Sequence, residues 1–207
     1  MEVNQKLRPY LKKKLEGLPG TDFSLSGENK DTQESLESFK KALAASMIII
    51  FIIIFIQFKS LALPAIIMSA IPFGLIGVVA SFKVFSLPIG FMALMGMLGL
   101  VGVVINDSIV LVTFIARTLK HEGWTLESVI TATKSRFRPV ILTTFTTVVG
   151  LLPVAHMPGG DPFLRPMATS FAYGLLFASG ITLLFIPALY KTLLDVMAKF
   201  NKAPDLE

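Results

Sequence analysis

The stretch GVVINDSIVLV, residues 102–112, places an amide, a carboxylate and a hydroxyl in a row inside a run of Val, Ile, Leu and Gly. The apolar segment around it, residues 89–116, exceeds the roughly 20 residues that a helix needs to cross a bilayer. An ionisable side chain at mid-bilayer costs about 2.5–3.5 kcal/mol on insertion scales, so it usually faces a bundle interior and often serves ion or proton movement. The stretch therefore predicts a membrane-spanning helix with a functional polar face.

The composition of the whole chain also indicates a membrane protein. Of its 207 residues, 53% are hydrophobic and 16% are charged, against roughly 25% charged in soluble domains. The mean hydropathy is +0.71. The sequence contains no cysteine, which excludes disulfides, thiolate metal sites and cysteine nucleophiles. Loop lysines and arginines account for the net charge of +5, and no nucleic-acid partner is expected.

Apolar runs predict an all-α membrane protein, a bundle of five transmembrane helices within a transmembrane domain of residues 36–195. The predicted spans are residues 42–58, 61–82, 89–116, 139–157 and 167–190. Between the third and fourth spans, residues 125–134 predict a short amphipathic helix on the membrane surface, with Thr125 as its N-cap. Residues 196–207 are predicted to form a tail.

The N-terminal residues 1–35 have a different character from the spans. Apolar residues recur at helical spacing between Val3 and Leu11, and TDFSLSG, residues 21–27, reads as one short strand. One helix and one strand are too little to bury a core of their own. We therefore expect residues 1–35 to be the α/β remnant of a larger domain outside the membrane, together with its connecting segment.

The distribution of lysine and arginine predicts the orientation, because these residues accumulate in short cytoplasmic loops. The first loop, the 116–138 connection and the residues after Tyr190 together hold nine, whereas the two opposite loops hold only Lys83 and Arg165. We therefore expect the 116–138 connection and the C-terminus to face the cytoplasm and residues 1–41 to face outward. Lys40 and Lys41 oppose this orientation for a chain that inserts alone.

The candidate site residues come from helical spacing in the third and fourth spans. Gly99, Gly102 and Asn106 share one face of the third span, and Asp107 lies about 100° round from it. Asp107 is the only acidic residue in the predicted spans. On the fourth span, one face carries Arg136, Thr143, Thr147 and Gly150. If these faces meet, glycines permit close helix packing around an amide, hydroxyls and a guanidinium.

Each of these residues also has a structural interpretation, and the sequence leaves both open. Asn106 could hydrogen-bond between helices, Asp107 could pair with Arg136 or Ser108, and Arg136 could be a positive-inside anchor. The threonines of the fourth span could be packing hydroxyls. Gly96, Gly99, Gly102 and Gly150 are predicted to be packing residues rather than a phosphate loop. His121 and His156 are single, so no metal site is expected. No Ser/His/Asp set lies at one depth, so no enzyme is expected.

Four consecutive stretches together resemble the RND (resistance-nodulation-cell division) superfamily, and within it the acriflavine-resistance type of efflux permease. The stretches are FKSLALPAIIMSAIPFGLIGV (58–78), GLVGVVINDSIVLVTFIARTLKHEG (99–123), RFRPVILTTFTTVVGLLPVAH (136–156) and FLRPMATSFAYGLLFASGITLLFIPALY (163–190). The RxRP and GxxxND patterns within them are fairly specific. The resemblance covers residues 35–195 in unbroken order.

This resemblance implies a proton-driven exporter with twelve spans, of which the present five look like spans eight to twelve. Such permeases move protons past an aspartate pair on span four, which this chain does not contain. Asn106 occupies the position of a lysine or asparagine on span ten, with Asp107 next to it. Arg136 and Thr143 match an arginine and a threonine on span eleven. The resemblance thus implies a proton relay through Asn106, Asp107, Arg136 and Thr143, with the proton as coupling ion and no cofactor.

The sequence reading is thus the C-terminal transmembrane half of a permease that exports drugs or other hydrophobic or amphiphilic molecules by proton antiport. Alone, the chain is expected to be inactive. The implied partners are the bilayer, the missing N-terminal half, further copies in a homotrimer, a periplasmic adaptor and an outer-membrane channel. The implied location is the bacterial inner membrane, with a periplasmic N-terminal segment and a cytoplasmic C-terminus. The alternatives are a non-transporting assembly or regulatory module, and an RND relative that moves lipid or protein.

Overall fold

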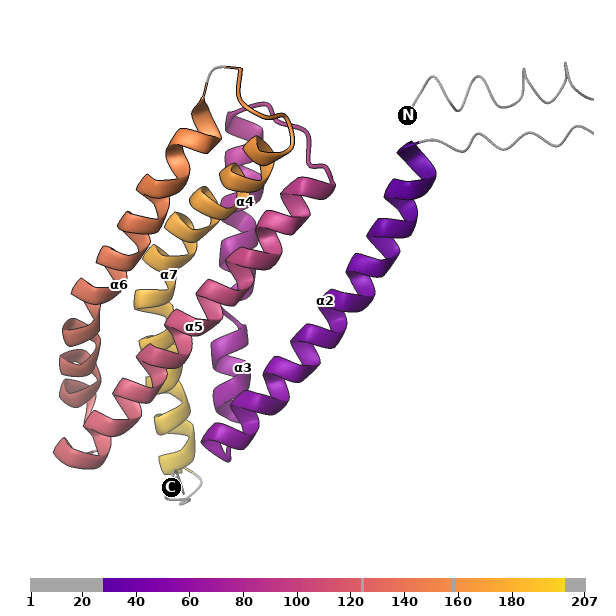
Figure 1. Ribbon diagram of the computed structural model, residues 1–207. Helices are drawn as coiled ribbons and strands as arrows, with labels where there is room; N and C mark the ends of the chain where they lie inside the picture. The colour runs from indigo at the N-terminus through magenta and orange to yellow at the C-terminus, as the bar shows by residue number, and fades with distance from the viewer. Residues whose placement is uncertain (1–27, 124, 158, 200–207) are drawn as a thin grey trace, which may run out of the picture. The chain divides into compact units, whose positions relative to one another are not determined.

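The computed structural model describes residues 28–123, 125–157 and 159–199, and over these ranges the chain is helical without strands (Figure 1). The expected helix and strand within residues 1–27 lie outside the described residues. The helices are α2 (Glu28–Phe58), α3 (Ala62–Met68), α4 (Ile71–Val84), α5 (Phe91–Glu122), α6 (Leu126–His156) and α7 (Leu164–Lys199).

The chain divides into two units, Met1–Phe39 and Lys40–Glu207. Of the first unit, only residues 28–39 are described, and they form the first turns of α2. The second unit contains the remainder of α2 and the helices α3 to α7.

Five helical segments among the described residues are long and apolar enough to cross a membrane. They are Ser35–Phe58, Ala62–Val84, Phe91–His121, Leu126–His156 and Leu164–Val196. Each contains or largely overlaps one predicted span, so the predicted all-α bundle of five transmembrane helices is confirmed. The helices α5, α6 and α7 are each longer than the predicted spans, since their polar end turns continue the helix beyond the apolar run.

The second span is broken between α3 and α4. Pro72 lies in the first turn of α4, where its missing N–H removes no intrahelical hydrogen bond. Inside a continuous helix, the Pro72 ring would clash with the carbonyl group four residues earlier. At the break, the Ala70 N–H bonds to the Ile67 carbonyl at 3.2 Å, and the Ser69 hydroxyl donates to the Ile66 carbonyl at 2.6 Å. These two hydrogen bonds replace regular helical hydrogen bonds at the break between α3 and α4.

The expected break between a surface helix at 125–134 and a span starting at Pro139 does not occur. Thr125 caps α6 by accepting the Ser128 N–H at 3.2 Å, as predicted, but the helix then runs unbroken to His156 with Pro139 in its interior. Packing explains the continuity, because buried α6 residues recur at four-residue spacing on both sides of the proline: Ser128, Ala132, Val140, Thr144 and Val148. A proline inside a spanning helix is tolerated where such neighbours support it.

The helix α7 lies at the centre of the bundle and packs against α3, α4, α5 and α6 (Figure 1). The core between these helices consists of buried aliphatic and small residues, among them Leu100, Val112 and Ile115 on α5 and Leu175 and Ala178 on α7. The C-termini of α5 and α7 and the N-terminus of α6 lie at one end of the bundle, which we call the Gly123 end. Gly123 ends α5 with φ = 94°, a left-handed conformation that favours glycine.

Candidate functional site

The polar triplet of the opening stretch lies midway along α5, and its three side chains have different surroundings. Asn106 is exposed, Asp107 is half-buried and Ser108 is buried. The Ser108 hydroxyl donates to the Val104 carbonyl of its own helix at 2.6 Å. The side chains of Asn106 and Asp107 make no hydrogen bond or ion pair with another described residue. Asp107 therefore pairs with neither Arg136 nor Ser108 in this chain.

Arg136 reaches from α6 to α5. Its guanidinium carbon lies 4.3 Å from the centroid of the Phe114 ring, within the distance of a favourable cation–π contact. The Arg136 side chain is half-buried, and its Nε is buried without a hydrogen-bond partner among the described residues. The Arg136 side chain thus lies against the Phe114 ring of α5.

The contact between Arg136 and Phe114 fixes the register of the two antiparallel helices. Asp107 precedes Phe114 by seven residues, and Thr143 follows Arg136 by seven. Seven residues are nearly two helical turns, about 10.5 Å along the axis, and return a side chain to almost the same face. Asp107 therefore lies on the Phe114 side of α5, and Thr143 on the Arg136 side of α6, at comparable depth in the bundle.

The predicted site residues are only partly gathered by this chain. Thr143 is exposed, and its hydroxyl donates to the Val140 and Pro139 carbonyls of its own helix at 2.9 and 3.2 Å. Asn106 is exposed on α5. The structure therefore brings Arg136 onto α5 and aligns Asp107 with Thr143, but it makes no direct link among the four candidates.

The glycines predicted to pack form two pairs with opposite surroundings. A Cβ at Gly96 would collide with the Ser170 Oγ and the Met167 carbonyl of α7, and a Cβ at Gly99 would lie 3.1 Å from the Phe171 ring. By contrast, a Cβ at Gly102 or Gly150 would meet no atom within 4 Å. Gly96 and Gly99 thus adjoin α7, whereas packing at Gly102 and Gly150 stays a prediction for a neighbour outside this chain.

These positions define an open polar face, by which we mean Gly102 and Asn106 on α5 with Thr143 and Gly150 on α6. All four are exposed. The opposite side of α5 packs against α7 through residues such as Gly96 and Leu100, which are buried. The small and polar residues that sequence spacing singled out are therefore mostly those that the five spans of this chain leave uncovered.

Sequence reasoning missed the polar contacts made by α7. Thr144 of α6 donates to the Ser179 hydroxyl at 2.8 Å, and Ser170 donates to the Ala93 carbonyl of α5 at 3.0 Å. Ser170, Gly174, Ala178 and Thr182 recur every four residues, a small-residue pattern typical of helix contacts in membranes, which could have identified this face. The buried Tyr190 hydroxyl has no hydrogen-bond partner among the described residues, and no sequence signal pointed to its burial.

No three His, Cys, Asp or Glu side chains gather in the described part of the chain in a way that could hold a metal ion. His156 instead approaches the Tyr173 hydroxyl through Nε2 at 3.2 Å and packs edge-on against the Phe85 ring. This aromatic cluster lies at the end of the bundle opposite the Gly123 end.

Long apolar helices, with an unpaired carboxylate and a half-buried guanidinium among them, define a multi-span α-helical membrane protein. Residues 3–194 match the AcrB/AcrD/AcrF family, and the chain belongs to this family of RND efflux permeases. The chain is accordingly a membrane-embedded protein.

Several characterised relatives share between a quarter and a third of the aligned residues. The chain is 28% identical to the cobalt-zinc-cadmium resistance protein CzcA of Cupriavidus metallidurans over 80% of its length, and 30% identical to the multidrug resistance protein MdtC of Erwinia tasmaniensis over 81%. It is 28% identical to the swarming motility protein SwrC of Bacillus subtilis over 93%. The matches cover 16%, 16% and 18% of these relatives, so the chain spans less than a fifth of their length.

Two crystal forms of a heavy metal efflux pump share the fold. They superpose with TM-scores of 0.70 and 0.73 over 90% and 93% of this chain, which is 19% of the pump in each case. The sequence identity is 23%, so this likeness concerns the fold alone.

Proposed function

We propose that this chain forms the second-half transmembrane part, spans eight to twelve, of a proton-driven RND export permease. The observation that carries the proposal is the α5–α6 pair. Arg136 is held on Phe114 at 4.3 Å, and the unpaired Asp107 lies two turns along the same side of α5. A carboxylate without a partner inside an apolar span is costly, and a role in proton movement explains why it is there.

In this proposal the open polar face is where the other half of the permease completes the relay. Asn106 and Thr143 belong to that face and would contact acidic groups contributed by the first half. Proton binding changes the charge of the relay, and export requires two arrangements of the bundle with different proton affinity. Arg136 of α6 supplies the positive charge of the relay, and its contact with Phe114 of α5 holds that charge in place.

The proposed setting follows from the family and from the distribution of lysine and arginine. The Gly123 end faces the cytoplasm of a bacterial inner membrane, and residues 1–35 belong to a periplasmic domain. The working assembly is a homotrimer with a periplasmic adaptor and an outer-membrane channel. The chain alone performs no enzymatic reaction and no transport, and the proton is the coupling ion in place of a cofactor.

Hydrophobic or amphiphilic molecules are the proposed cargo, in line with the relative named as a multidrug resistance protein. Metal cations are a second candidate, because another relative is named as a cobalt-zinc-cadmium resistance protein. Lipid or protein cargo and a non-transporting regulatory role are the remaining alternatives.

The proposal is tested by deleting and restoring the complete gene that encodes this segment in its host. Cells are loaded with ethidium in one arm and challenged with cobalt, zinc and cadmium in the other, with and without a protonophore. The proposal predicts that the gene lowers accumulation of one cargo class and that the protonophore abolishes the difference. Accumulation that is independent of the gene for both classes supports the non-transporting alternative. Efflux by residues 1–207 alone contradicts the expected inactivity.

A further inference from the structure

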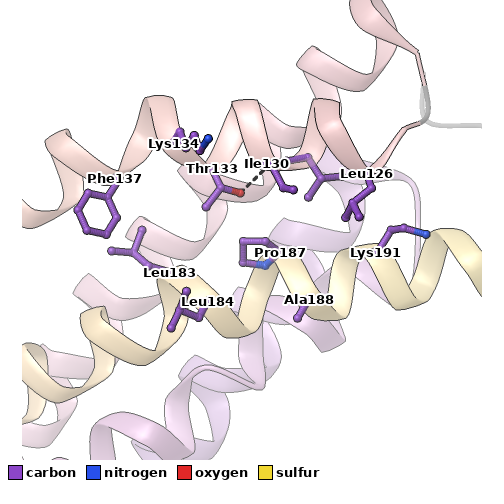
Figure 2. A pocket seen from close by; sticks show the side chains of 11 residues that line it. Leu126, Ile130, Thr133, Lys134, Phe137, Leu183, Leu184, Pro187, Ala188 and Lys191 are labelled. Carbon is purple, nitrogen blue, oxygen red and sulfur yellow. Dashed lines mark hydrogen bonds between the residues drawn. The ribbon is translucent and has the colours of Figure 1, made fainter.

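A groove of about 610 Å³ lies between the first half of α6 and the last half of α7, near the Gly123 end (Figure 2). It is formed by α6 with α7, whereas the residues of the open polar face lie on α5 and α6. Figure 2 shows side chains from the two helices facing each other across it, with Leu126 and Ile130 on α6 and Leu184 and Ala188 on α7. Its volume lies within the range of about 300–1,000 Å³ that is typical of sites for small ligands.

The groove is apolar along its length, and its α7 side includes short side chains. Pro187 and Ala188 are small residues where α7 faces α6. The floor is buried, with Val129 at 2% and Leu183 at 4% exposure, whereas the wall residue Leu184 is 76% exposed. Among the described residues of the lining, the one hydroxyl is that of Thr133, which donates back to the Val129 carbonyl at 2.8 Å. An occupant of the groove therefore meets hydrocarbon and finds no free hydroxyl.

Two ammonium groups border this hydrocarbon surface, one from each helix: Lys134 of α6 and Lys191 of α7. Lys191 forms an ion pair with Asp195 on the next turn of α7. Lys134 makes no ion pair with a described residue. Glu127 is exposed in the first turn of α6 and does not line the groove. The lining thus contributes two positive charges, of which one is partly compensated.

We propose that this groove binds an anionic phospholipid of the leaflet at the Gly123 end, with one acyl chain along the floor and the phosphate at Lys134 and Lys191. The groove lies between two membrane-spanning helices, so lipid acyl chains surround it. Long lysine side chains lie along apolar surface and extend their ammonium groups to the headgroup level. Basic pockets between spanning helices are suited to anionic headgroups.

The charge asymmetry gives the proposal its sharpest consequence. Because Lys191 shares its charge with Asp195, Lys134 contributes more to headgroup binding. Removing the Asp195 carboxylate releases Lys191 and strengthens binding. A groove that merely accepts any acyl chain would respond to neither change.

The test is native mass spectrometry of the whole chain, released from detergent with dioleoyl phosphatidylglycerol or dioleoyl phosphatidylcholine. The two lipids have identical chains, so the ratio of their dissociation constants isolates the headgroup. We expect a preference for phosphatidylglycerol that falls about fivefold in Lys134→Gln, falls less in Lys191→Gln and rises in Asp195→Asn. Filling the groove with Ala188→Phe should weaken binding of both lipids.

Matched controls carry the same charge changes away from the groove. Lys120→Gln lies at the same end of the bundle on α5, and Asp161→Asn lies at the opposite end; both side chains are exposed. Circular dichroism of every variant verifies the fold. Equal binding of the two lipids by the unmodified chain contradicts the proposal, and so does an equal loss in Lys120→Gln and Lys134→Gln. A change of oligomeric state in Ala188→Phe, with lipid binding unaltered, would assign the groove to a second protein chain instead.

Discussion

At the scale of single residues, the neighbouring polar side chains of Asn106, Asp107 and Ser108 have three different surroundings. Each step along a helix rotates the side chain by about 100°. Asn106 therefore points to a surface that this chain leaves uncovered, Asp107 to the edge of the core and Ser108 into the core. Ser108 satisfies its hydroxyl on its own helix, a bond that serines in helices commonly make. Asp107 has no comparable partner, so its cost of burial is uncompensated within this chain. The lack of a partner distinguishes Asp107, the candidate functional residue, from Ser108, whose hydroxyl is hydrogen-bonded within α5.

The Phe114 ring is predicted to hold Arg136. Replacing Phe114 with Leu should lower the free energy of unfolding by about 0.5–2 kcal/mol, because it removes a partly desolvated cation–π contact. The measurement is unfolding of the chain in mixed micelles followed by circular dichroism. Phe114→Trp, which keeps a π-face, should lose less stability. The control Phe145→Leu alters a ring that is 62% exposed; an equal loss in both leucine variants would show that the ring contact is not stabilising.

At the scale of helices, the packing of α5 on α7 depends on small residues. Gly96 and Gly99 let α5 approach α7, and Gly77 on α4 allows a similar approach, since a Cβ there would lie 2.5 Å from the Phe177 Cβ. Without a hydrophobic driving force inside a bilayer, such close contact and interhelical hydrogen bonds are what hold spans together. The polar contacts of Ser170 and Thr144 supply the hydrogen-bonding part.

Gly96 and Gly102 form a matched pair for testing this packing. Gly96→Ala should lower the free energy of unfolding by about 1–3 kcal/mol, because the added methyl group overpacks a filled contact. Gly102→Ala should leave it unchanged or raise it by up to about 1 kcal/mol, since alanine has the higher helix propensity. Unfolding in mixed micelles measures both. The reverse order of stabilities would place the tight α5–α7 contact elsewhere.

The hydroxyl pair between α6 and α7 is testable by a double-mutant cycle. Thr144→Val and Ser179→Ala each remove one partner of the 2.8 Å hydrogen bond. We expect a coupling free energy of about 0.6 kcal/mol, and at most about 1.7 kcal/mol, as found for hydrogen bonds between membrane helices. Thr146→Val is the control, since that hydroxyl bonds only within α6. Additive effects of Thr144→Val and Ser179→Ala would show that the two hydroxyls do not interact.

The sequence was sufficient to predict that the spanning helices exist but not where they begin and end. Long apolar runs identify the spans because any backbone in lipid must satisfy its own hydrogen bonds. The effect of a proline is less predictable, since it depends on neighbouring helices. Pro72 divides α3 from α4, whereas Pro139 and Pro153 lie inside a continuous α6. Packing against α7, which no single-helix pattern contains, sustains the helix around Pro139.

At the scale of the whole molecule, helical spacing predicted which residues share a face but not what covers that face. Gly102 and Asn106 do lie together on α5, and both are exposed. Arg136 and Thr143 lie on the same face of α6, but Thr143 is exposed. Arg136 is partly covered because it contacts Phe114 of α5. The chain spans less than a fifth of the length of its relatives, and the proposed function assigns the open polar face to contact with the other half of such a permease.

The most direct test of the account is proton flux through the complete permease carrying Asp107→Asn. A pH gradient is imposed across inverted membrane vesicles, and a pH-sensitive dye measures the proton flux that follows addition of the cargo. The account predicts that Asp107→Asn greatly reduces cargo-dependent proton flux at unchanged abundance, while Asp161→Asn, the same change at an exposed connection, leaves it intact. Full cargo-dependent proton flux in Asp107→Asn would contradict the central claim that Asp107 takes part in proton movement.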